Sequence, residues 1–315
     1  MIANPIIRRI GVVGTGVIGA SWAAYFLARG LEVSATDPAP GARERLTEAI
    51  ALHWPTLVKS GLAEGASQDK LTFHESLESA LEGVQFVQES GPERIDLKRA
   101  LFTRIDAALD ENVLIASSSS GLLMSDVQTA CRYPQRVVLG HPFNPPHLIP
   151  LVEVIGGEHT SPDAIQRAMD FYQAIGKRPI NPRKEIKGHI ANRLQAALWR
   201  EAFHLVSIGA VSVSDIDAAI AYGPGLRWAV MGPFANLHLS GGEGGMQHVL
   251  EHLGGPIESW WADLGTPALT PGLKQQVIDG IGAELAGRGA NQIATQRDDM
   301  ILGLLRAKAA STSLP

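Results

Sequence analysis

The stretch "RIGVVGTGVIGASWAAYFLARGLEVSATD", residues 9 to 37, decides the fold. Residues 8 to 13 have the length and apolar character of a short buried strand, and residues 17 to 29 carry apolar positions at helical spacing up to Gly30. The apolar segment "LEVSATD" then predicts a second strand. A strand, a glycine-rich turn, a helix and a strand in this order form a βαβ unit, which favours a parallel sheet covered by helices.

The turn "GTGVIG" has the G-x-G-x-x-G spacing of a dinucleotide-binding loop. The first glycine permits the tight turn, the second lets a pyrophosphate approach the backbone, and the third lets the helix pack on the strand. The helix N-terminus then offers free N–H groups to the phosphates. Glycines that serve only a tight turn are the alternative. We assign the cofactor phosphates to Gly14, Thr15, Gly16, Val17, Ile18 and Gly19.

The cofactor is predicted from Asp37, which ends the second strand eighteen residues after Gly19. A carboxylate there accepts hydrogen bonds from the ribose hydroxyls of the adenosine half and repels a 2′-phosphate. No arginine follows until Arg43. NAD is therefore expected rather than NADP.

Further apolar strands, "VQFVQES" and "NVLIASS", alternate with helical stretches to about residue 120, whereas nearly everything after residue 188 has helical periodicity. The change falls in the charged stretch "PRKEIKG", residues 182 to 188. We predict an α/β fold: a Rossmann-type, doubly wound, mostly parallel sheet in residues 1–187, followed by an all-α domain in residues 188–315.

Composition limits the partners and the location of the protein. Among 315 residues the formal net charge is −5, without a basic stripe that would follow a nucleic-acid backbone. No apolar run is long enough to span a bilayer, and no signal peptide precedes the first strand. The single cysteine, Cys131, is typical of a reducing compartment. We expect a soluble cytoplasmic protein that binds neither nucleic acid nor membranes.

Three polar groups stand where ligands bind in open α/β sheets, at the ends of strands. The run Ser117 to Ser120 follows an apolar strand, where it can cap a helix or face the crevice, and we choose Ser120 as its site residue. His141 follows the apolar "RVVLG", and Glu153 interrupts the apolar "IPLVEVI". If the two segments neighbour one another, the carboxylate holds the imidazole as a general base. A purely structural contact of Glu153 with a backbone donor or an arginine is the alternative.

The chain resembles the L-3-hydroxyacyl-CoA dehydrogenase superfamily over nearly its whole length. The resemblance rests on "GTGVIG", "SSSSGL", "GHPFNPP…PLVEV" and "GHIANRLQAALWREAFHLV", in this order and spacing. It is greater for the branch that acts on free 3-hydroxy acids, through "DPAPGA", "QESGPERIDLK", "RKEIKGHIANRL", "YGPGLRWAVMG" and "GGEGGMQHV". The resemblance implies NAD-dependent oxidation of a free L-3-hydroxy acid, with L-carnitine as the first substrate to consider, and a homodimer.

The resemblance also implies a role for individual residues. His141 is the implied general base, Glu153 its orienting partner, and Ser120 and Asn192 hydrogen-bond donors to the reacting oxygen. The positions implied to contact the nicotinamide half of the cofactor are Glu93, Lys98 and Asn144. Asn192 as a helix-bridging residue and Lys98 as a solvated helix lysine are the structural alternatives.

The substrate stays open at this point. "SSSG" at 118–121 and "GLRWAVMGP" at 225–233 depart from the residues usual in the acyl-CoA enzymes, which disfavours a CoA thioester. L-gulonate, another short 3-hydroxy acid, a 3-hydroxyacyl-CoA, or a nucleotide-binding structural or sensor protein remain alternatives. Arg227 is the candidate fork for a substrate carboxylate, unless it forms an ordinary salt bridge. The aromatic candidates for a quaternary ammonium are Phe143, Trp228 and Phe234, with Trp199, Trp260 and Trp261 as further ones, and packing in the core is the alternative for all of them.

No metal site is expected. His248 and His252 in "HVLEH" share a helical face, but the adjacent glutamate and the third ligand of a zinc site are missing.

Overall fold

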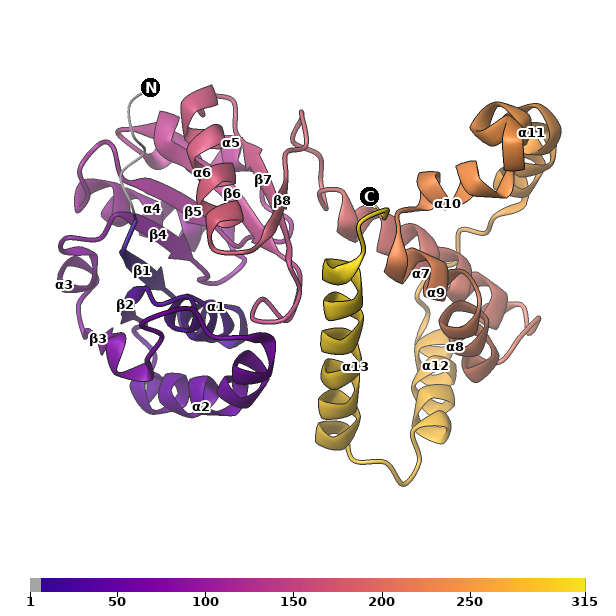
Figure 1. Ribbon diagram of the computed structural model, residues 1–315, viewed down its shortest axis with the longest axis horizontal. Coiled ribbons are helices and arrows are strands. Elements are labelled where there is room, and N and C mark those ends of the chain that lie inside the picture. The colour runs from indigo at the N-terminus through magenta and orange to yellow at the C-terminus, as the bar shows by residue number, and fades with distance from the viewer. Residues whose placement is uncertain (1–6, 315) are drawn as a thin grey trace. The chain divides into compact units, whose positions relative to one another are not determined.

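The computed structural model describes residues 7–314, and the chain divides into two compact units on either side of the Arg193–Leu194 bond. The described part of the first unit contains one eight-stranded sheet in the order β3-β2-β1-β4-β5-β6-β7-β8 (Figure 1). Its strands are β1 (Arg9–Val13), β2 (Glu32–Thr36), β3 (Leu71–Phe73), β4 (Phe86–Glu89), β5 (Leu114–Ser117), β6 (Val137–Pro142), β7 (Leu151–Gly156) and β8 (Arg178–Ile180). The pairing of β6 with β7 is antiparallel and the others are parallel. The predicted mostly parallel sheet is thus confirmed.

Helices cover both faces of this sheet, because its central strands are apolar on both sides. One core contains Ile10 and Val12 of β1 together with side chains of α1 (Val17–Ala28), α2 (Ala42–Ser60) and α6 (Pro162–Ala174). The other contains Val13 together with side chains of α3 (Leu77–Leu81), α4 (Ile95–Ala107) and α5 (Met124–Val127). Figure 1 shows α1 and α2 side by side along one side of the strands. The sheet is therefore doubly wound, as predicted.

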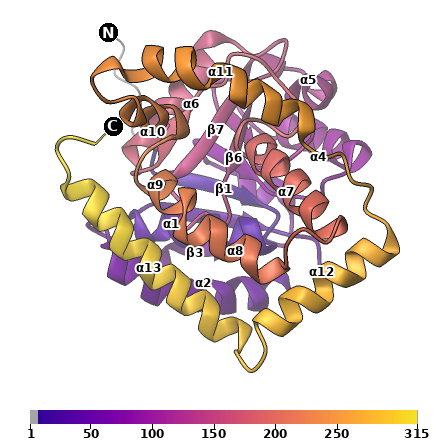
Figure 2. The same ribbon diagram turned by 90° about the vertical axis from the view of Figure 1, so that its right-hand side faces the viewer.

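The second unit is helical throughout its regular elements, as the periodicity predicts. After α7 (Ala191–Ser207), which begins in the first unit, it contains α8 (Val213–Tyr222), α9 (Pro224–Val230), α10 (Pro233–Ser240), α11 (Gly245–Asp263), α12 (Pro271–Glu284) and α13 (Ala290–Ala310). Ser212 and Thr270 cap α8 and α12 by accepting a hydrogen bond from the backbone three residues on. Figure 2 shows α12 and α13 as two long helices joined by a short loop.

Short 3₁₀ turns complete the described elements, at η1 (Gln68–Lys70), η2 (Gln128–Ala130), η3 (Pro134–Arg136) and η4 (Gly242–Gly244). Within residues 7–314, no helix combines the length and the apolar character needed to cross a membrane.

Candidate active site

Gly14 and Gly19 of the "GTGVIG" turn meet the steric requirements for which they were predicted. Gly14 has φ +87°, and a Cβ there would lie 2.8 Å from the backbone of Ser90 at the end of β4. A Cβ on Gly19 would lie 1.9 Å from the carbonyl oxygen of Gly14, so α1 packs directly on the turn. At Gly16 a Cβ would meet nothing within 4 Å, which leaves open space beside the start of α1. Binding of a cofactor pyrophosphate in this space stays a prediction.

Asp37 lies directly beyond β2 and already contacts the glycine turn. Its Oδ2 accepts hydrogen bonds from the backbone N–H of Thr15, at 2.7 Å, and from the hydroxyl of Thr15, at 3.3 Å. Its Oδ1 accepts one from the N–H of Ala39. The carboxylate that was predicted to bind the ribose therefore also fixes the geometry of the phosphate-binding turn.

His141 and Glu153 lie directly opposite one another across the antiparallel pair β6 and β7. Residues in this relation point their side chains to the same face of the sheet. His141 is 4% exposed, Glu153 is fully buried, and His141 Nδ1 lies 2.9 Å from Glu153 Oε2. Because a carboxylate only accepts, Nδ1 carries the hydrogen, and Nε2 is the nitrogen that can take up a proton.

The start of α7 holds the other oxygen of Glu153. Oε1 accepts hydrogen bonds from the backbone N–H groups of Ile190, at 2.8 Å, and Ala191, at 3.2 Å. Burial by itself would raise the pKa of Glu153, but the hydrogen bonds from His141, Ile190 and Ala191 outweigh it and hold the pKa below its ordinary value. Glu153 is therefore a carboxylate, and the positive end of the α7 dipole also favours that charge.

The serine run forms a turn after β5 that Glu93 holds. Glu93 Oε1 accepts hydrogen bonds from the Ser119 hydroxyl at 2.6 Å and from the Gly121 N–H at 2.7 Å. Burial would raise the pKa of Glu93, but these bonds, with Lys98 and Leu122, lower it. The serines do not cap α5, contrary to one of their predicted uses: Glu185 accepts from the N–H groups at the start of that helix. Ser120, the chosen site residue, is exposed on this turn.

Lys98 is buried rather than solvated. Its ammonium donates at 2.8 and 3.1 Å to the carboxylate of Glu89 and at 3.1 Å to the carbonyl of Gly91, and both charged side chains are fully buried. The three donors of the ammonium are thus engaged within the protein. The alternative of a solvated helix lysine is wrong, and a contact of Lys98 with nicotinamide stays a prediction.

The other predicted residues of the first unit lie around the same turn and strand end. Asn192 Nδ2 lies 3.5 Å from the carbonyl oxygen of Ser120, which joins the first turn of α7 to the serine run. Asn144 and Phe143 follow β6 directly, and the ring of Phe143 stands edge-on to the imidazole of His141 at 6.4 Å between centroids. The structure therefore brings together Ser120, His141, Glu153 and Asn192.

Three predicted substrate residues belong to the second unit. Arg227 and Trp228 lie in α9 and Phe234 in α10, and all three side chains are exposed. Arg227 forms no ion pair with any residue of the described range 7–314. The substrate contacts of these three residues stay predictions.

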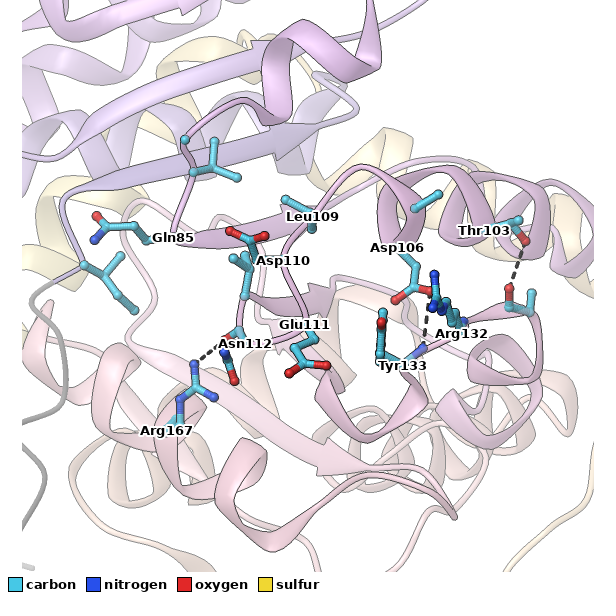
Figure 3. Close-up of a pocket in the computed structure, with 16 residues that line it drawn as sticks. Gln85, Thr103, Asp106, Leu109, Asp110, Glu111, Asn112, Arg132, Tyr133 and Arg167 are labelled. Carbon is cyan, nitrogen blue, oxygen red and sulfur yellow. Dashed lines mark hydrogen bonds between the residues drawn. The ribbon is translucent and has the colours of Figure 1, made fainter.

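A cavity of about 1000 Å³ opens elsewhere, at the amino-terminal ends of β4 and β5 (Figure 3). The labelled side chains around it include Gln85, Asp106, Asn112, Arg132 and Arg167. The carboxylate of Asp106 accepts from the N–H of Arg132, and Arg167 donates to the carbonyl of Asn112. None of the predicted site residues lines this cavity, which lies at the sheet edge opposite the catalytic pair.

No group of three potential metal ligands is present among residues 7–314. His248 and His252 do share a face of α11, with their rings 4.0 Å apart. Cys131 packs against the second core, and burial together with Asp106 raises the pKa of its thiol to about 12. Its thiolate is therefore not accessible near neutral pH.

Sequence reasoning missed two residues that organise the site. Glu185 holds the start of α5, and His189 lies beside His141 with 5.0 Å between ring centroids. Glu185 stands in the stretch that was interpreted as a domain boundary, and His189 follows it in a segment that was used only for the family resemblance. The available signal was a histidine between Gly188 and the helix that carries Asn192. Histidine is one of the non-glycine residues that are enriched at positive φ.

Comparisons with known proteins agree with this geometry. Residues 9–186 match the NAD binding domain of 3-hydroxyacyl-CoA dehydrogenase, and residues 188–265 match the C-terminal domain of the same family. The L-carnitine dehydrogenase of Streptomyces griseus is 53% identical over 301 residues, which cover 96% of this chain and 90% of the relative. The L-carnitine dehydrogenase of Bacillus cereus is 47% identical over 300 residues, covering 95% and 92%.

Among solved structures, the NAD⁺-dependent dismutase 5-formyl-3-hydroxy-2-methylpyridine 4-carboxylic acid 5-dehydrogenase superposes with a TM-score of 0.83 at 29% identity. The superposition covers 97% of this chain and 99% of that one. The fold is thus shared over nearly the whole chain. With the NAD binding domain, these matches confirm NAD as the cofactor and an NAD-dependent oxidoreductase as the class of enzyme.

Proposed function

The chain belongs to the 3-hydroxyacyl-CoA dehydrogenase family, and we propose that within this family it oxidises L-carnitine, a free L-3-hydroxy acid, to 3-dehydrocarnitine with NAD. The reaction rests on one observation, the buried hydrogen bond between His141 and Glu153 near the carboxyl end of β6, and the dinucleotide turn follows the carboxyl end of β1 in the same sheet. The choice of L-carnitine is supported by relatives of that activity at 53% and 47% identity over nearly the whole chain.

The chain's own residues supply the proton chemistry. Glu153 accepts the hydrogen of His141 Nδ1, which leaves Nε2 as the base for the substrate hydroxyl and stabilises the imidazolium that forms. Asn192 has a second amide hydrogen beyond the one directed at Ser120, and it donates with the Ser120 hydroxyl to the oxygen on which negative charge develops. NAD, when bound, is the hydride acceptor of this reaction.

The cofactor residues of the proposal are the turn Gly14–Gly19 for the pyrophosphate and Asp37 for the adenosine ribose, with Glu93, Lys98 and Asn144 towards the nicotinamide. For the substrate, Arg227 is the partner of the carboxylate, and aromatic faces suit a quaternary ammonium because it has no hydrogen to donate. Phe143, Trp228 and Phe234 are the aromatic candidates. The proposed domains are residues 1–187 for cofactor binding and 188–315 for substrate closure and dimerisation.

A homodimer formed through the helical unit is part of the proposal. Large apolar side chains are more than half exposed there, which is unusual for a monomeric surface; they include Leu194, Ile208, Tyr222, Phe234, Leu239, Trp260, Trp261 and Met300. Size-exclusion chromatography with light scattering tests this directly, and a monomer at micromolar concentration would reject it. We also propose a cytoplasmic location, which is consistent with a single cysteine and is tested by cell fractionation.

The decisive experiment is NADH formation by the purified protein at mildly alkaline pH. L-carnitine, L-gulonate, L-3-hydroxybutyrate and L-3-hydroxybutyryl-CoA are compared at equal concentration, each with NAD and with NADP. Efficient turnover of L-carnitine with NAD is the expected result. Preference for the thioester would replace the substrate but keep the catalytic pair, whereas NADH binding without any turnover would indicate a nucleotide-binding structural or sensor protein.

A further inference from the structure

A second imidazole, that of His189, lies beside the catalytic pair, and the proposed reaction gives it no role. Its side chain is 2% exposed, and its ring is tilted by 50° to that of His141 with 5.0 Å between centroids. Nε2 lies 3.2 Å from the carbonyl oxygen of Ser119 in the serine run. Because a carbonyl only accepts, Nε2 must carry a hydrogen. His189 Nδ1 is buried and has no hydrogen-bond partner in the described part of the chain.

The backbone at His189 serves Glu153. His189 has φ +51°, directly after Gly188 with φ +79°, and it is the non-glycine residue with positive φ among residues 7–314. This left-handed turn directs the next two N–H groups, those of Ile190 and Ala191, at Glu153 Oε1. A side chain with a Cβ is disfavoured in this conformation, so contacts of the imidazole must help to hold it.

Burial and the neighbouring His141 favour the neutral form of His189. It faces His141 from β6, Glu153 from β7 and Glu93 from the segment before α4. Burial and the positive charge of a protonated His141 lower the pKa of His189, against the Ser119 carbonyl and the two carboxylates, which raise it. When His141 takes up the substrate proton, His189 therefore stays uncharged and keeps its single donor directed at Ser119.

We propose that His189 is a positioning residue that holds three parts of the active site in register. Its Nε2–H binds the carbonyl oxygen of Ser119 and so holds the backbone directly before Ser120. Its own backbone presents the two amides to Glu153, and its ring packs against that of His141. This inference rests on the proposed function, since it assumes that His141 is the base. The role is specific to a neutral imidazole with its hydrogen on Nε2.

Two substitutions separate this role from simple packing. His189→Phe keeps a ring of similar size but removes the donor, and His189→Gln places an amide N–H near the position of Nε2. We expect His189→Phe to lower kcat for L-carnitine roughly 10- to 100-fold while the KM for NAD and the Kd for NADH stay unchanged, since catalysis depends on sub-ångström placement. His189→Gln should recover most of the lost kcat.

His159→Phe is the matched control. His159 lies in the loop after β7, beside the start of β6 and thus at the other end of the strands from His141. Thermal unfolding of each variant checks that the protein is folded. A kcat of His189→Phe within twofold of the wild type would overturn the proposal. So would a His189→Gln variant as impaired as His189→Phe, because the donor would then not be the feature that matters.

A readout without substrate distinguishes failure of this inference from failure of the proposed function. Long-range ¹H–¹⁵N correlation spectra report the tautomer of each histidine, and we expect His189 to carry its hydrogen on Nε2 alone near neutral pH. His189→Phe should shift the Nδ1–H resonance of His141 that is bonded to Glu153. A hydrogen on Nδ1 of His189, or an unchanged His141 resonance in the variant, would reject the positioning role even if L-carnitine is oxidised.

Discussion

Replacement of Glu153 by Gln tests whether the buried carboxylate serves catalysis or only stability. A glutamine can still accept from the N–H groups of Ile190 and Ala191 through its oxygen. Its amide then presents hydrogens to His141 Nδ1, which must accept instead of donate. The ring hydrogen moves to Nε2, and the nitrogen that should take the substrate proton is no longer a base.

The magnitudes differ for the two roles. Enforcing the wrong tautomer in a comparable acid–histidine pair costs about 10⁴ in kcat, so we expect a loss of roughly 10³ to 10⁴, equivalent to about 4 to 5.5 kcal/mol. The stability change is smaller. The two charge-assisted hydrogen bonds from the N–H groups of Ile190 and Ala191 become neutral ones, which costs about 1 kcal/mol of stability each. A neutral amide, however, is easier to bury than a carboxylate. The free energy of unfolding should fall by at most about 2 kcal/mol.

The assay combines kcat for NADH formation with urea unfolding of the same preparations. Glu158→Gln, at an exposed position in the loop after β7, is the control and should match the wild type in both. The reasoning is refuted if Glu153→Gln keeps kcat within tenfold of the wild type. A large loss of stability with nearly intact turnover would mean that Glu153 only anchors α7.

Three further outcomes follow from other parts of the structure. Asp37→Ser removes the carboxylate that accepts from the Thr15 N–H and that repels a 2′-phosphate. The affinity for NAD should fall roughly 10- to 100-fold, and the ratio of kcat/KM with NADP to kcat/KM with NAD should rise. An unchanged ratio would contradict the predicted contact of Asp37 with the ribose. Lys98→Met leaves the Glu89 carboxylate buried without its cation and should cost about 3 to 5 kcal/mol in urea unfolding, and a loss below about 1 kcal/mol would show that the ion pair contributes little. The pKa of His189 is lowered from 6.5 in the folded protein, so the unfolded chain takes up this proton first as the pH falls. The free energy of unfolding of the wild type should therefore fall by up to about 1.4 kcal/mol per pH unit below 6.5. In unfolding measurements between about pH 5 and 7, His189→Gln should flatten this slope.

The parts of the fold that the sequence predicts are those that local geometry determines. The glycine turn is one example, since a positive φ at Gly14 and the contact of Gly19 with a backbone oxygen are requirements within a few residues of chain. The helices beyond residue 188 are another, since their apolar periodicity depends only on spacing along the chain. Such features leave a pattern of residue types at fixed spacing, which can be read without knowing the tertiary structure.

Partners that are distant in sequence leave no such pattern. Lys98 has the spacing of an ordinary helix lysine, and only the arrangement of β4 and α4 shows that Glu89 neutralises it in the interior. Asp37 was predicted to contact only the cofactor, but it also holds Thr15, 22 residues earlier in the chain. His189 was overlooked because its partner is a backbone carbonyl, and any residue provides one.

The reversal of direction between β6 and β7 explains why an apolar strand carries a carboxylate. In an antiparallel pair, residues twelve apart can lie directly opposite, which places Glu153 against His141 on one face. An unpaired buried carboxylate would be too costly to retain, but Glu153 has donors on both oxygens, from the imidazole and from the start of α7. The same bonds that offset its burial fix the tautomer of His141. Stability and the direction of proton transfer therefore depend on one side chain, and they can be separated only by a substitution that keeps its shape and removes its charge.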